Sequence, residues 1–593
     1  MTAHDGGSSL VAARRLRRGL AAPQTLADLI RAPYAEDPAG EAVRFCHHSA
    51  EPESLSWEGI WHSACVQLAR LQAAGIEPGD RVLILLPTGP EFISTFFGVV
   101  LAGGIPVPAA PPGPLNGAGF AAHAERIGNI SADCQAAAAI ALPAVLEALK
   151  ARLTPANPRI ALLTPGPAAG DAPAAAIAHE PCPTDLALLQ YTSGSTSQPK
   201  GVELTHRNVL ENTAAIVESV WHPGAVGLSW LPLHHDMGLI GTFLSALHGR
   251  IPVVLLPSRS FIADPARWLR CISEYRATIT VAPNFAFVYC VENVDLNAVA
   301  DVRLDSLRIA LNGAEPVDPA AVARFEEKFA PLGLRQGVVL PVYGLAENCL
   351  AVTFAEPGLF LIDEVDADRL ERDGRAVPAT DGSRRRRFVS VGVPIGHQRV
   401  RIADGASRSL PERQVGEILV AGPSVMKGYH RQPRQTAQAL RGGWLRTGDL
   451  GYLADGRLYV TGRRKDIIIR HGRNYYPQDL EHQVKDIQGI RSDSAVAFSG
   501  DGDGRAWIVV VAETRLRDPQ ARQEAAREIR RRIHDACLLG PDEVLLVRPG
   551  TIPRTTSGKV RRQECKRRYL AGELGESEPS ASARAAAGLE ERH

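Results

Sequence analysis

The sequence lacks an excess of either charge. Its 593 residues contain 66 Lys and Arg against 65 Asp and Glu, which leaves a net charge of +1. A near-neutral chain gives no electrostatic reason to expect nucleic acid or an anionic membrane as a partner. The longest apolar run, 92–107, is broken by glycine and proline and is too short to span a bilayer. We therefore expect no nucleic-acid partner and no stable membrane insertion.

Cysteine is sparse and follows no pattern. The nine cysteines form no Cys-x-x-Cys pair, which excludes a zinc ribbon or a thioredoxin motif. Residues 1–20 hold several arginines but no apolar segment of the kind that a secretion signal needs. We therefore expect free thiols and a cytoplasmic protein.

Lysine is also scarce, with eight residues against 58 arginines. A lysine ammonium is a compact charge on a flexible stem, which the planar guanidinium group of arginine does not copy. Where arginine is the usual cation, each lysine is a candidate functional residue. The eight are Lys150, Lys200, Lys328, Lys427, Lys465, Lys485, Lys559 and Lys566.

Strand-like and helical patterns alternate along most of the chain, which predicts an α/β fold. A smaller segment with three strand-like runs and the amphipathic stretch Gln520–Cys537 predicts a separate α+β domain. We expect disordered tails at 1–22 and 571–593, a large domain at 23–464 and a small one at 465–570. The strand-like runs of the large domain are Arg81–Leu86, Ala277–Ala282, Arg308–Asn312, Gly337–Tyr343, Gly416–Ala421 and Arg457–Thr461.

The segment 190–201, QYTSGSTSQPKG, is the most informative of the chain. It follows the strand-like run Leu186–Gln190, and its glycine, hydroxyl groups and Lys200 could surround phosphate oxygens. It is not a Walker A loop, because the G-x-x-x-x-G-K-[ST] spacing is absent. A plain turn remains the alternative for such a run taken alone.

This segment resembles the phosphate loop of the adenylate-forming superfamily, which includes acyl-CoA ligases, luciferases and adenylation domains of peptide synthetases. Five further motifs follow in the order expected for that superfamily, and the resemblance spans about residues 25 to 570. It implies a large multi-layer N-terminal adenylation domain and a small mobile α+β C-terminal domain. The further motifs are Gly313-Ala314-Glu315-Pro316, Tyr343-Gly344-Leu345-Ala346-Glu347, Arg446-Thr447-Gly448-Asp449, Gly462-Arg463-Arg464-Lys465-Asp466 and Pro553-x5-Lys559.

The resemblance implies that ATP and Mg²⁺ are used. Tyr343 would stack on adenine, Asp449 would accept hydrogen bonds from the ribose hydroxyls, and Glu347 with Thr196 would hold the metal. A core tyrosine, a turn aspartate and a helix-terminal carboxylate are the ordinary alternatives. The implied ATP- and AMP-binding residues are Thr192, Ser193, Gly194, Ser195, Thr196, Lys200, Gly313, Ala314, Glu315, Tyr343, Gly344, Asp449 and Arg463.

The implied reaction is attack of a carboxylate on the α-phosphorus of ATP, which yields an acyl-adenylate and diphosphate. Such a reaction depends on positioning and on cations rather than on a protein nucleophile. The resemblance implies catalytic roles for Lys559, His235 and Arg463, and a hinge at Lys465 about which the small domain turns. A solvated loop lysine is the alternative for Lys559.

Two features resemble one subfamily, the fatty acyl-AMP ligases. One is the run WLPLHHDMGLIG at 230–241 together with YGLAEN at 343–348 and GRNYYPQDLE at 472–481. The other is an insertion at about 359–387, which otherwise reads as a charged, partly helical surface stretch. In that subfamily the insertion hampers the use of CoA, and the acyl group passes to the phosphopantetheine thiol of an acyl carrier protein. No carrier is fused here, so we expect a fatty acid as substrate and a carrier protein in trans.

Other functions stay open at this stage. A long- or medium-chain fatty acyl-CoA ligase shares every adenylation motif, and a catalytically silent binding protein could keep the fold. A luciferase-type oxygenase is a third, remote reading. The aspartate by which amino-acid adenylation domains bind the α-amine is missing, which disfavours amino acids. Core packing or an apolar tunnel explains Phe243, Leu244, Leu247, Phe285 and Phe287 equally well.

Overall fold

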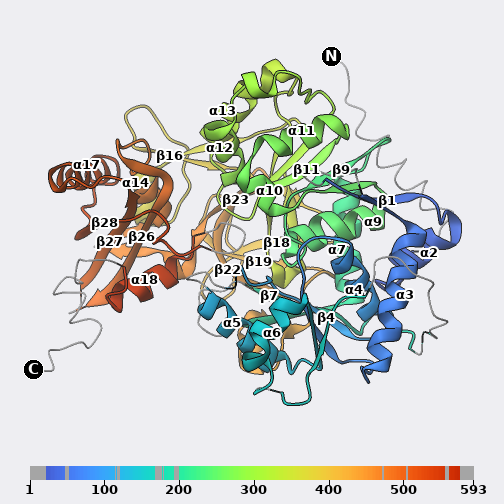
Figure 1. Ribbon diagram of the computed structural model, residues 1–593. Coiled ribbons are helices and arrows are strands. Elements are labelled where there is room, and N and C mark those ends of the chain that lie inside the picture. The colour runs from blue at the N-terminus through green and yellow to red at the C-terminus, as the bar shows by residue number, and fades with distance from the viewer. Residues whose placement is uncertain are drawn as a thin grey trace, which may run out of the picture.

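Two parts of unequal size make up the molecule in the computed structural model (Figure 1). The smaller, orange to red in Figure 1, is formed by the C-terminal part of the chain from β24 onward. The described residues are 22–46, 53–113, 115, 120–155, 157–166, 177, 179–192, 199–470, 473–502, 505–554 and 560–574.

A nine-stranded sheet forms the centre of the large part. Its six middle strands run parallel, and antiparallel strands complete both edges. Both faces are buried, as neighbouring residues of one strand show: Val253 and Leu255 enter one core, and Val254 enters the other. The strand order is β17 (Val393–Pro394), β14 (Ala351–Phe354), β13 (Val339–Gly344), β12 (Ile309–Gly313), β11 (Ile279–Pro283), β9 (Gly227–Ser229), β10 (Val253–Leu255), β1 (Glu41–Phe45) and β2 (Glu53–Ser56).

A second, parallel sheet lies on the far side of a helical layer. Its strands are β4 (Ile105–Pro108), β3 (Arg81–Leu85), β5 (Ala138–Ala141) and β6 (Ala161–Leu163). Val82 and Ile84 pack in the core shared with the large sheet, and Leu83 and Leu85 face the opposite core. The layers are therefore helix, sheet, helix, sheet, helix. The outer helices are α11 (Ala266–Glu274), α12 (Asn284–Asn293) and α13 (Pro319–Phe329) on one side and α5 (Phe120–Cys134) and α6 (Pro143–Leu153) on the other, with α3 (Trp57–Ala73), α4 (Pro90–Leu101), α7 (His206–Val220) and α9 (Ser245–Gly249) between the sheets.

Antiparallel sheets join the layers to the C-terminal part. One contains β20 (Gly428–Tyr429), β8 (Lys200–Thr205) and β7 (Leu186–Thr192). Another contains β18 (Arg399–Ala403), β19 (Gly416–Ala421), β22 (Trp444–Ala454) and β21 (Leu440–Arg441), with β23 (Arg457–Arg463) paired to β22. The insertion forms a hairpin of β15 (Ile362–Asp366) and β16 (Arg385–Val389) with α14 (Ala367–Asp373) between them.

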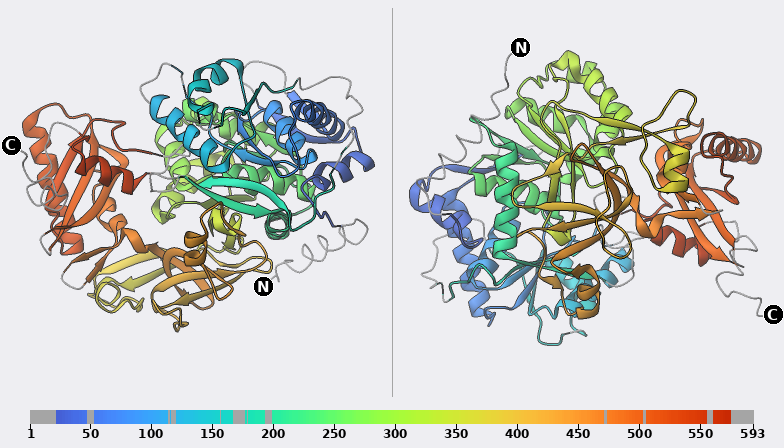
Figure 2. Two further views of the ribbon diagram at one scale, coloured as in Figure 1. Left: turned by 90° about the horizontal axis from the view of Figure 1, so that it is seen from below. Right: turned by 180° about the vertical axis from the view of Figure 1, so that it is seen from behind.

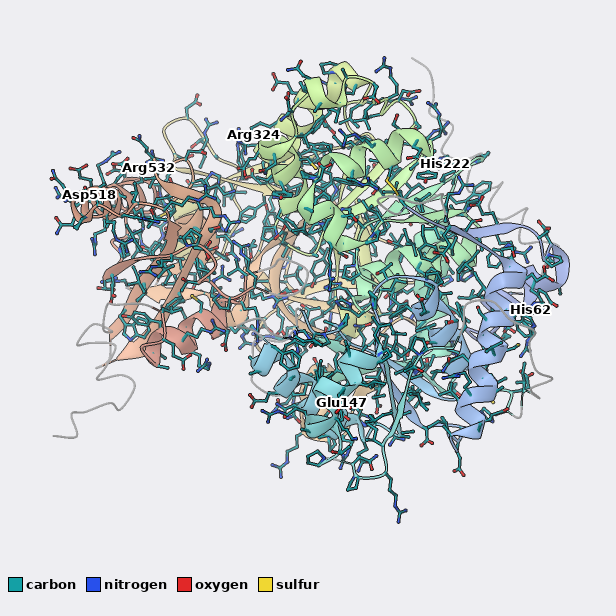
Figure 3. All side chains as sticks on the ribbon, viewed as in Figure 1. His62, Glu147, His222, Arg324, Asp518 and Arg532 are labelled. Carbon is teal, nitrogen blue, oxygen red and sulfur yellow. A yellow bond between two sulfur atoms is a disulfide. The ribbon has the colours of Figure 1, made fainter. Side chains whose placement is uncertain are left out.

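The C-terminal part is the small α+β unit that the sequence predicts. Along β27 (Arg505–Thr514), Val510 faces α17 (Pro519–Cys537), whereas Val509 and Val511 face α18 (Arg562–Leu570). Asp518 caps α17 by accepting a 2.8 Å hydrogen bond from Ala521 N, and Arg532 lies farther along the same helix (Figure 3). The other elements are β24 (Ile468–Arg470), β25 (Arg473–Tyr475), α16 (Pro477–His482), β26 (Ile490–Gly502) and β28 (Glu543–Val547).

The layered sheets and helices confirm the predicted α/β fold, but the prediction about cysteine is partly wrong. Cys46, after β1, and Cys271, on α11, are joined in a disulfide, so the prediction of free thiols is wrong for these two. The two residues are 225 apart in sequence, and no local pattern predicts their proximity. The other seven cysteines are free. The tails predicted to be disordered lie mostly outside the described residues.

Candidate active site

One cleft of about 1740 Å³ lies where the large part meets the C-terminal part. Residues from both parts line it, and most of the described residues that the motifs single out are among them. Gly313 precedes the lining residue Ala314 but is not itself among the lining residues, whereas Ser193, Gly194, Ser195, Thr196 and Lys559 lie outside the described residues. The predicted residues that line the cleft are Thr192, Lys200, His235, Ala314, Glu315, Tyr343, Gly344, Glu347, Asp449, Arg463 and Lys465.

Tyr343, Asp449 and Arg463 form one polar chain in the wall. Tyr343, near the end of β13, donates a 2.8 Å hydrogen bond to Oδ2 of Asp449 on β22. Nε of Arg463, which ends β23, lies 3.2 Å from Oδ1 of the same carboxylate. Burial, with the Asp449 charge beside it, raises the pKa of Tyr343 well above its usual value, so the phenol stays a donor.

The backbone next to Tyr343 is shaped by close packing. A Cβ atom on Gly313 would lie 2.6 Å from Val342 Cγ2, and one on Gly344 would lie 2.0 Å from the Leu350 carbonyl oxygen. Only glycine fits at either place. Ala314 follows Gly313 with a φ of 73°, and Glu315 accepts a 2.6 Å hydrogen bond from Phe285 N.

Glu347, Tyr429 and Lys200 form a second cluster. Tyr429 on β20 donates a 2.8 Å hydrogen bond to Oε1 of Glu347, and Nζ of Lys200 lies 5.1 Å from the centre of the Tyr429 ring. An ammonium over an aromatic face is attracted by the ring quadrupole. The tyrosine thus separates the predicted metal carboxylate from the lysine that follows the phosphate loop. Sequence reasoning missed Tyr429, which belongs to none of the motifs.

The two adjacent histidines have different surroundings. Nδ1 of His235 lies 2.7 Å from Oδ1 of Asp236, at the start of the short helix α8 (Asp236–Gly238). Burial, followed by the neighbouring His235, lowers the pKa of His234 to about 3. Within the described part of the chain its Nε2 has no hydrogen-bond partner. His234 is therefore neutral at physiological pH. Gln190 holds the segment by donating a 3.1 Å hydrogen bond to the His234 carbonyl oxygen.

A small apolar pocket shares part of the cleft wall. It shares Ile216, Gly241, Val281 and Leu311 with the cleft, and Thr242 and Ser245 belong to its wall. The π-helical segment Leu239–Leu244 carries Gly241 and Thr242. Of the five candidate tunnel residues, Phe285 alone lines either of these two cavities. Phe243, Leu244, Leu247 and Phe287 pack in the described core instead.

Lys465 lies at the junction of the two parts, in the turn Arg464–Asp466. Burial, and next the charge of Arg463, lowers the pKa of Lys465. Asp466 accepts hydrogen bonds from Arg562 (3.2 Å) and Gln563 (2.8 Å), which ties the turn to α18.

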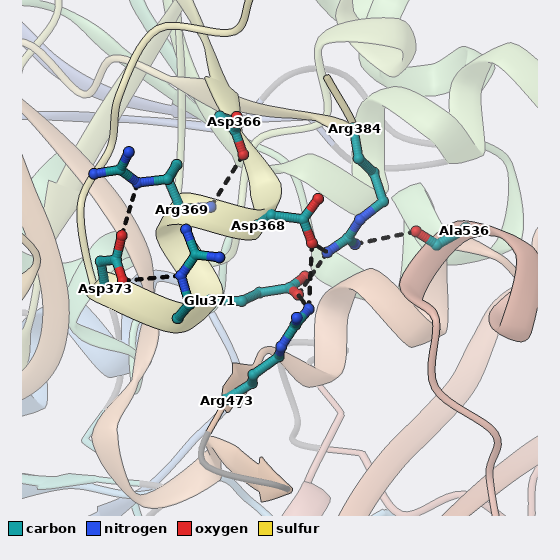
Figure 4. A network of polar contacts seen from close by, with 9 residues as sticks. Asp366, Asp368, Arg369, Glu371, Asp373, Arg384, Arg473 and Ala536 are labelled. Atoms are coloured by element: carbon teal, nitrogen blue, oxygen red, sulfur yellow. Dashed lines mark hydrogen bonds and ion pairs between the residues drawn. The ribbon is translucent and has the colours of Figure 1, made fainter. Parts of the chain in front are cut away.

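The insertion hairpin is also tied to the C-terminal part, as Figure 4 shows. Arg384 pairs with the buried Glu371 at 2.5 Å and with Asp368 at 3.2 Å, and it donates a 3.1 Å hydrogen bond to the Ala536 carbonyl oxygen of α17. Arg473, on β25, reaches back to Asp368 at 3.3 Å. The views in Figure 2 likewise place the hairpin beside the C-terminal part.

A second contact lies near this network. Arg386 of the hairpin pairs with Asp479 of α16 at 3.0 Å. Its guanidinium carbon lies 4.6 Å from the centre of the Phe388 ring and 4.1 Å from that of Tyr476. The insertion is therefore a packed element between the two parts, which its charged sequence alone did not predict.

The comparisons with known proteins agree with this geometry. The family model described as AMP-binding enzyme matches residues 33–430. This chain belongs to the AMP-binding enzyme family. A second model, Disco-interacting protein 2-like, AMP domain, matches residues 465–578 of this AMP-binding enzyme. Use of ATP goes with membership of the family.

Two relatives and one solved structure are similar to this AMP-binding enzyme over most of its length. A putative acyl-CoA synthetase of Caulobacter vibrioides is 36% identical over 88% of this chain and 92% of its own length. The medium-chain-fatty-acid–[acyl-carrier-protein] ligase JamA of Moorena producens is 34% identical over 93% of this chain and 96% of its own length. A structure from a study of fatty acyl-adenylate ligases of E. coli and L. pneumophila matches with a TM-score of 0.85 and 34% sequence identity. The match covers 93% of this chain and 98% of the chain in that structure. The resemblance to the fatty acyl-AMP ligases is thereby confirmed.

Proposed function

We propose that the chain activates a fatty acid with ATP to a fatty acyl-AMP and then transfers the acyl group to the phosphopantetheine thiol of an acyl carrier protein. The observation that carries this proposal is that the Asp449 carboxylate and the Glu347–Tyr429–Lys200 cluster line one cleft, which shares part of its wall with an apolar pocket. It is supported by relatives named for fatty acid–carrier ligation and for fatty acyl-AMP formation.

In the first step a carboxylate oxygen of the fatty acid attacks the α-phosphorus of ATP. The new O–P bond forms while the bond from the α-phosphorus to the bridging oxygen breaks, and diphosphate leaves. No proton must be removed, because the acid is already ionised. The residues bind and orient: Asp449 takes the ribose hydroxyls, and Arg463 and Lys200 supply positive charge, together with Lys559 from the C-terminal part.

In the second step the thiol sulfur attacks the acyl carbonyl carbon, the thiol proton is lost and AMP leaves. The lysine that serves the first step must give way to the thiol. We therefore propose a large domain at 23–464, a lid domain at 465–570 and a hinge at Lys465. We place the reaction in the cytoplasm, where ATP is available.

Mg²⁺ belongs to the same proposal. Magnesium sites commonly combine one or two carboxylates with substrate phosphate oxygens, and Glu347 offers such a carboxylate on the cleft wall. The Tyr429 hydroxyl orients it. Thr196, the second expected ligand, lies outside the described residues. When bound, the ion would neutralise charge on the phosphate oxygens.

The acceptor distinguishes this proposal from its nearest alternative, a fatty acyl-CoA ligase, which the name of the Caulobacter relative favours. The ties from the hairpin to α17 and β25 support a carrier protein, since they oppose the turning of the lid. The test gives purified enzyme preformed acyl-AMP with either CoA or a holo-carrier protein. We expect acyl-carrier and little acyl-CoA; efficient acyl-CoA formation would establish the alternative.

A further inference from the structure

Two arginines face the same region of the cleft from opposite sides. Arg126 comes from α5 of the large part, and Arg561 directly precedes α18 of the C-terminal part. Both line the cleft. Figures 1 and 2 show α5 on the side of the large part that faces the C-terminal part. Neither arginine belongs to the set that the motifs assign to ATP.

Hydrogen bonds fix the guanidinium group of Arg126 and the backbone of Arg561. Nη2 of Arg126 lies 3.4 Å from the carbonyl oxygen of Thr192, the last residue of β7 and the first of the predicted phosphate-binding set. The backbone N–H of Arg561 donates a 2.8 Å hydrogen bond to the Pro553 carbonyl oxygen, and its own carbonyl accepts one of 2.9 Å from Cys565 N. Nε of Arg561 is buried and has no hydrogen-bond partner among the residues that the structure describes.

The charges of this pair are not balanced by the described residues. Among the described residues, neither Arg126 nor Arg561 forms an ion pair with a carboxylate. Arg562, by contrast, pairs with Glu481 and Asp466. Burial, and then the charge of Arg561, lowers the pKa of Arg126, so the two cations are close enough to repel one another. Holding the desolvated Arg126 guanidinium next to a second cation is costly, and an anion between the two would remove the cost.

We propose that Arg126 and Arg561 together hold the outer phosphates of ATP and the diphosphate that leaves. Guanidinium groups suit this task because they bind phosphate oxygens with two parallel hydrogen bonds. The position beside Thr192 is where a triphosphate tail would lie if the segment after it holds phosphate. This inference rests on the proposed function and adds two binding residues to it.

One consequence concerns the order of events. While diphosphate is bound, it joins the large part to the C-terminal part through the pair. Once diphosphate has left, the two cations repel one another without compensation, which favours separation of the two parts. Departure of the first product would therefore promote the movement that admits the thiol.

The test compares Arg126→Gln and Arg561→Gln with wild type in two half-reactions. In fatty-acid-dependent exchange of labelled diphosphate into ATP, we expect the KM for diphosphate to rise about 10-fold to 100-fold in each variant, with a smaller change in kcat. Arg561→Lys should recover only part of the loss, because an ammonium cannot bind bidentately. Transfer from purified acyl-AMP to holo-carrier protein, which involves no diphosphate, should remain at the wild-type rate.

Phosphopantetheine also carries a phosphate, and the same experiment separates the two sources. A raised KM for the holo-carrier with unchanged exchange kinetics would overturn the proposal in favour of the carrier phosphate. Unchanged kinetics in both half-reactions would also overturn it. The matched control is Arg531→Gln on α17, an exposed arginine paired with Glu528 and Asp535. If wild type itself gives no exchange, the proposed function fails rather than this inference.

Should a variant unfold, binding is measured on the other one. Direct titration of the folded variant with inorganic diphosphate must then show weaker binding than wild type by the same factor. Equal affinity in that titration would contradict the role assigned to the pair.

Discussion

The hydroxyl of Tyr343 donates a 2.8 Å hydrogen bond to Oδ2 of Asp449, although the two residues are 106 positions apart in the chain. Arg463 holds the other oxygen of that carboxylate at 3.2 Å. The carboxylate is thus oriented from two sides and lies in the wall of the cleft. This arrangement links the proposed adenine contact to the proposed ribose contact.

Asp449→Asn should weaken nucleotide binding. The neutral amide loses the charge-assisted hydrogen bonds, so we expect the KM for ATP to rise about 10-fold to 100-fold in diphosphate exchange. Tyr343→Phe keeps the ring and should cost less than Asp449→Asn. Asp455→Asn, in the exposed turn between β22 and β23, is the control. Wild-type kinetics for Asp449→Asn would remove this residue from the site.

Lys559→Ala should abolish adenylation while the protein stays folded. Loss of one cation that stabilises the transition state costs roughly 10²–10³ in rate. The measurement is diphosphate exchange, with thermal unfolding as the check on folding. Lys150→Ala, an exposed lysine on α6, is the matched control. A fully active Lys559 variant would contradict the role proposed for it.

Arg384→Ala should raise the use of CoA. This change removes the hydrogen bond to Ala536 and the pairs with Glu371 and Asp368, so the hairpin no longer holds α17. We expect acyl-CoA formation from preformed acyl-AMP to increase, and deletion of 359–387 to increase it further. Arg385→Ala, whose partners Glu364 and Asp381 both lie within the hairpin, should leave it unchanged. If CoA turnover stays at the wild-type level in both the Arg384 variant and the deletion, the insertion does not restrict the acceptor.

The free energy of unfolding should depend on His206 at acid pH. Burial lowers the pKa of His206 to about 4, and its Nδ1 accepts a 3.0 Å hydrogen bond from Leu26 N. Because the unfolded chain binds this proton with an ordinary pKa near 6.5, the contribution is fully present above pH 6.5. It is lost as the pH falls towards 4 and amounts to about 3 kcal/mol.

Chemical denaturation between these pH values measures the effect. His206→Asn keeps an acceptor but does not titrate, so its stability should fall less steeply with decreasing pH than that of wild type. His534→Asn, on an exposed position of α17, is the control. Parallel profiles for wild type and His206→Asn would show that the histidine does not titrate as described.

Much of the fold could be predicted because local patterns carried it. The predicted strand Gly416–Ala421 has the bounds of β19, and the predicted helix Gln520–Cys537 differs from α17 by one residue. Strands buried on both faces, such as β3, appear as continuous apolar runs. The motif residues meet in one cleft because several lie at the ends of strands: Gly344, next to Tyr343, ends β13, and Arg463 ends β23.

The rest depends on contacts between distant segments. Tyr429 on Glu347, Arg126 beside Arg561 and the Cys46–Cys271 pair leave no signal in the local sequence. The insertion was predicted as a partly helical surface stretch because its charges suggest solvent, but Glu371 is buried and pairs with Arg384, and Arg386 pairs with Asp479 of the C-terminal part. Arginines of α18 are paired as well: Arg562 pairs with Glu481, and Arg567 and Arg568 pair with Glu564.

The most direct measurement combines purified protein, ATP, Mg²⁺ and a saturated fatty acid such as laurate, and follows both released diphosphate and the acyl-AMP mass. The proposed function predicts diphosphate release that requires the fatty acid, with an equal amount of acyl-AMP. Diphosphate at the level of the fatty-acid-free blank, for medium- and long-chain acids alike, would contradict it and would favour a silent member of the family.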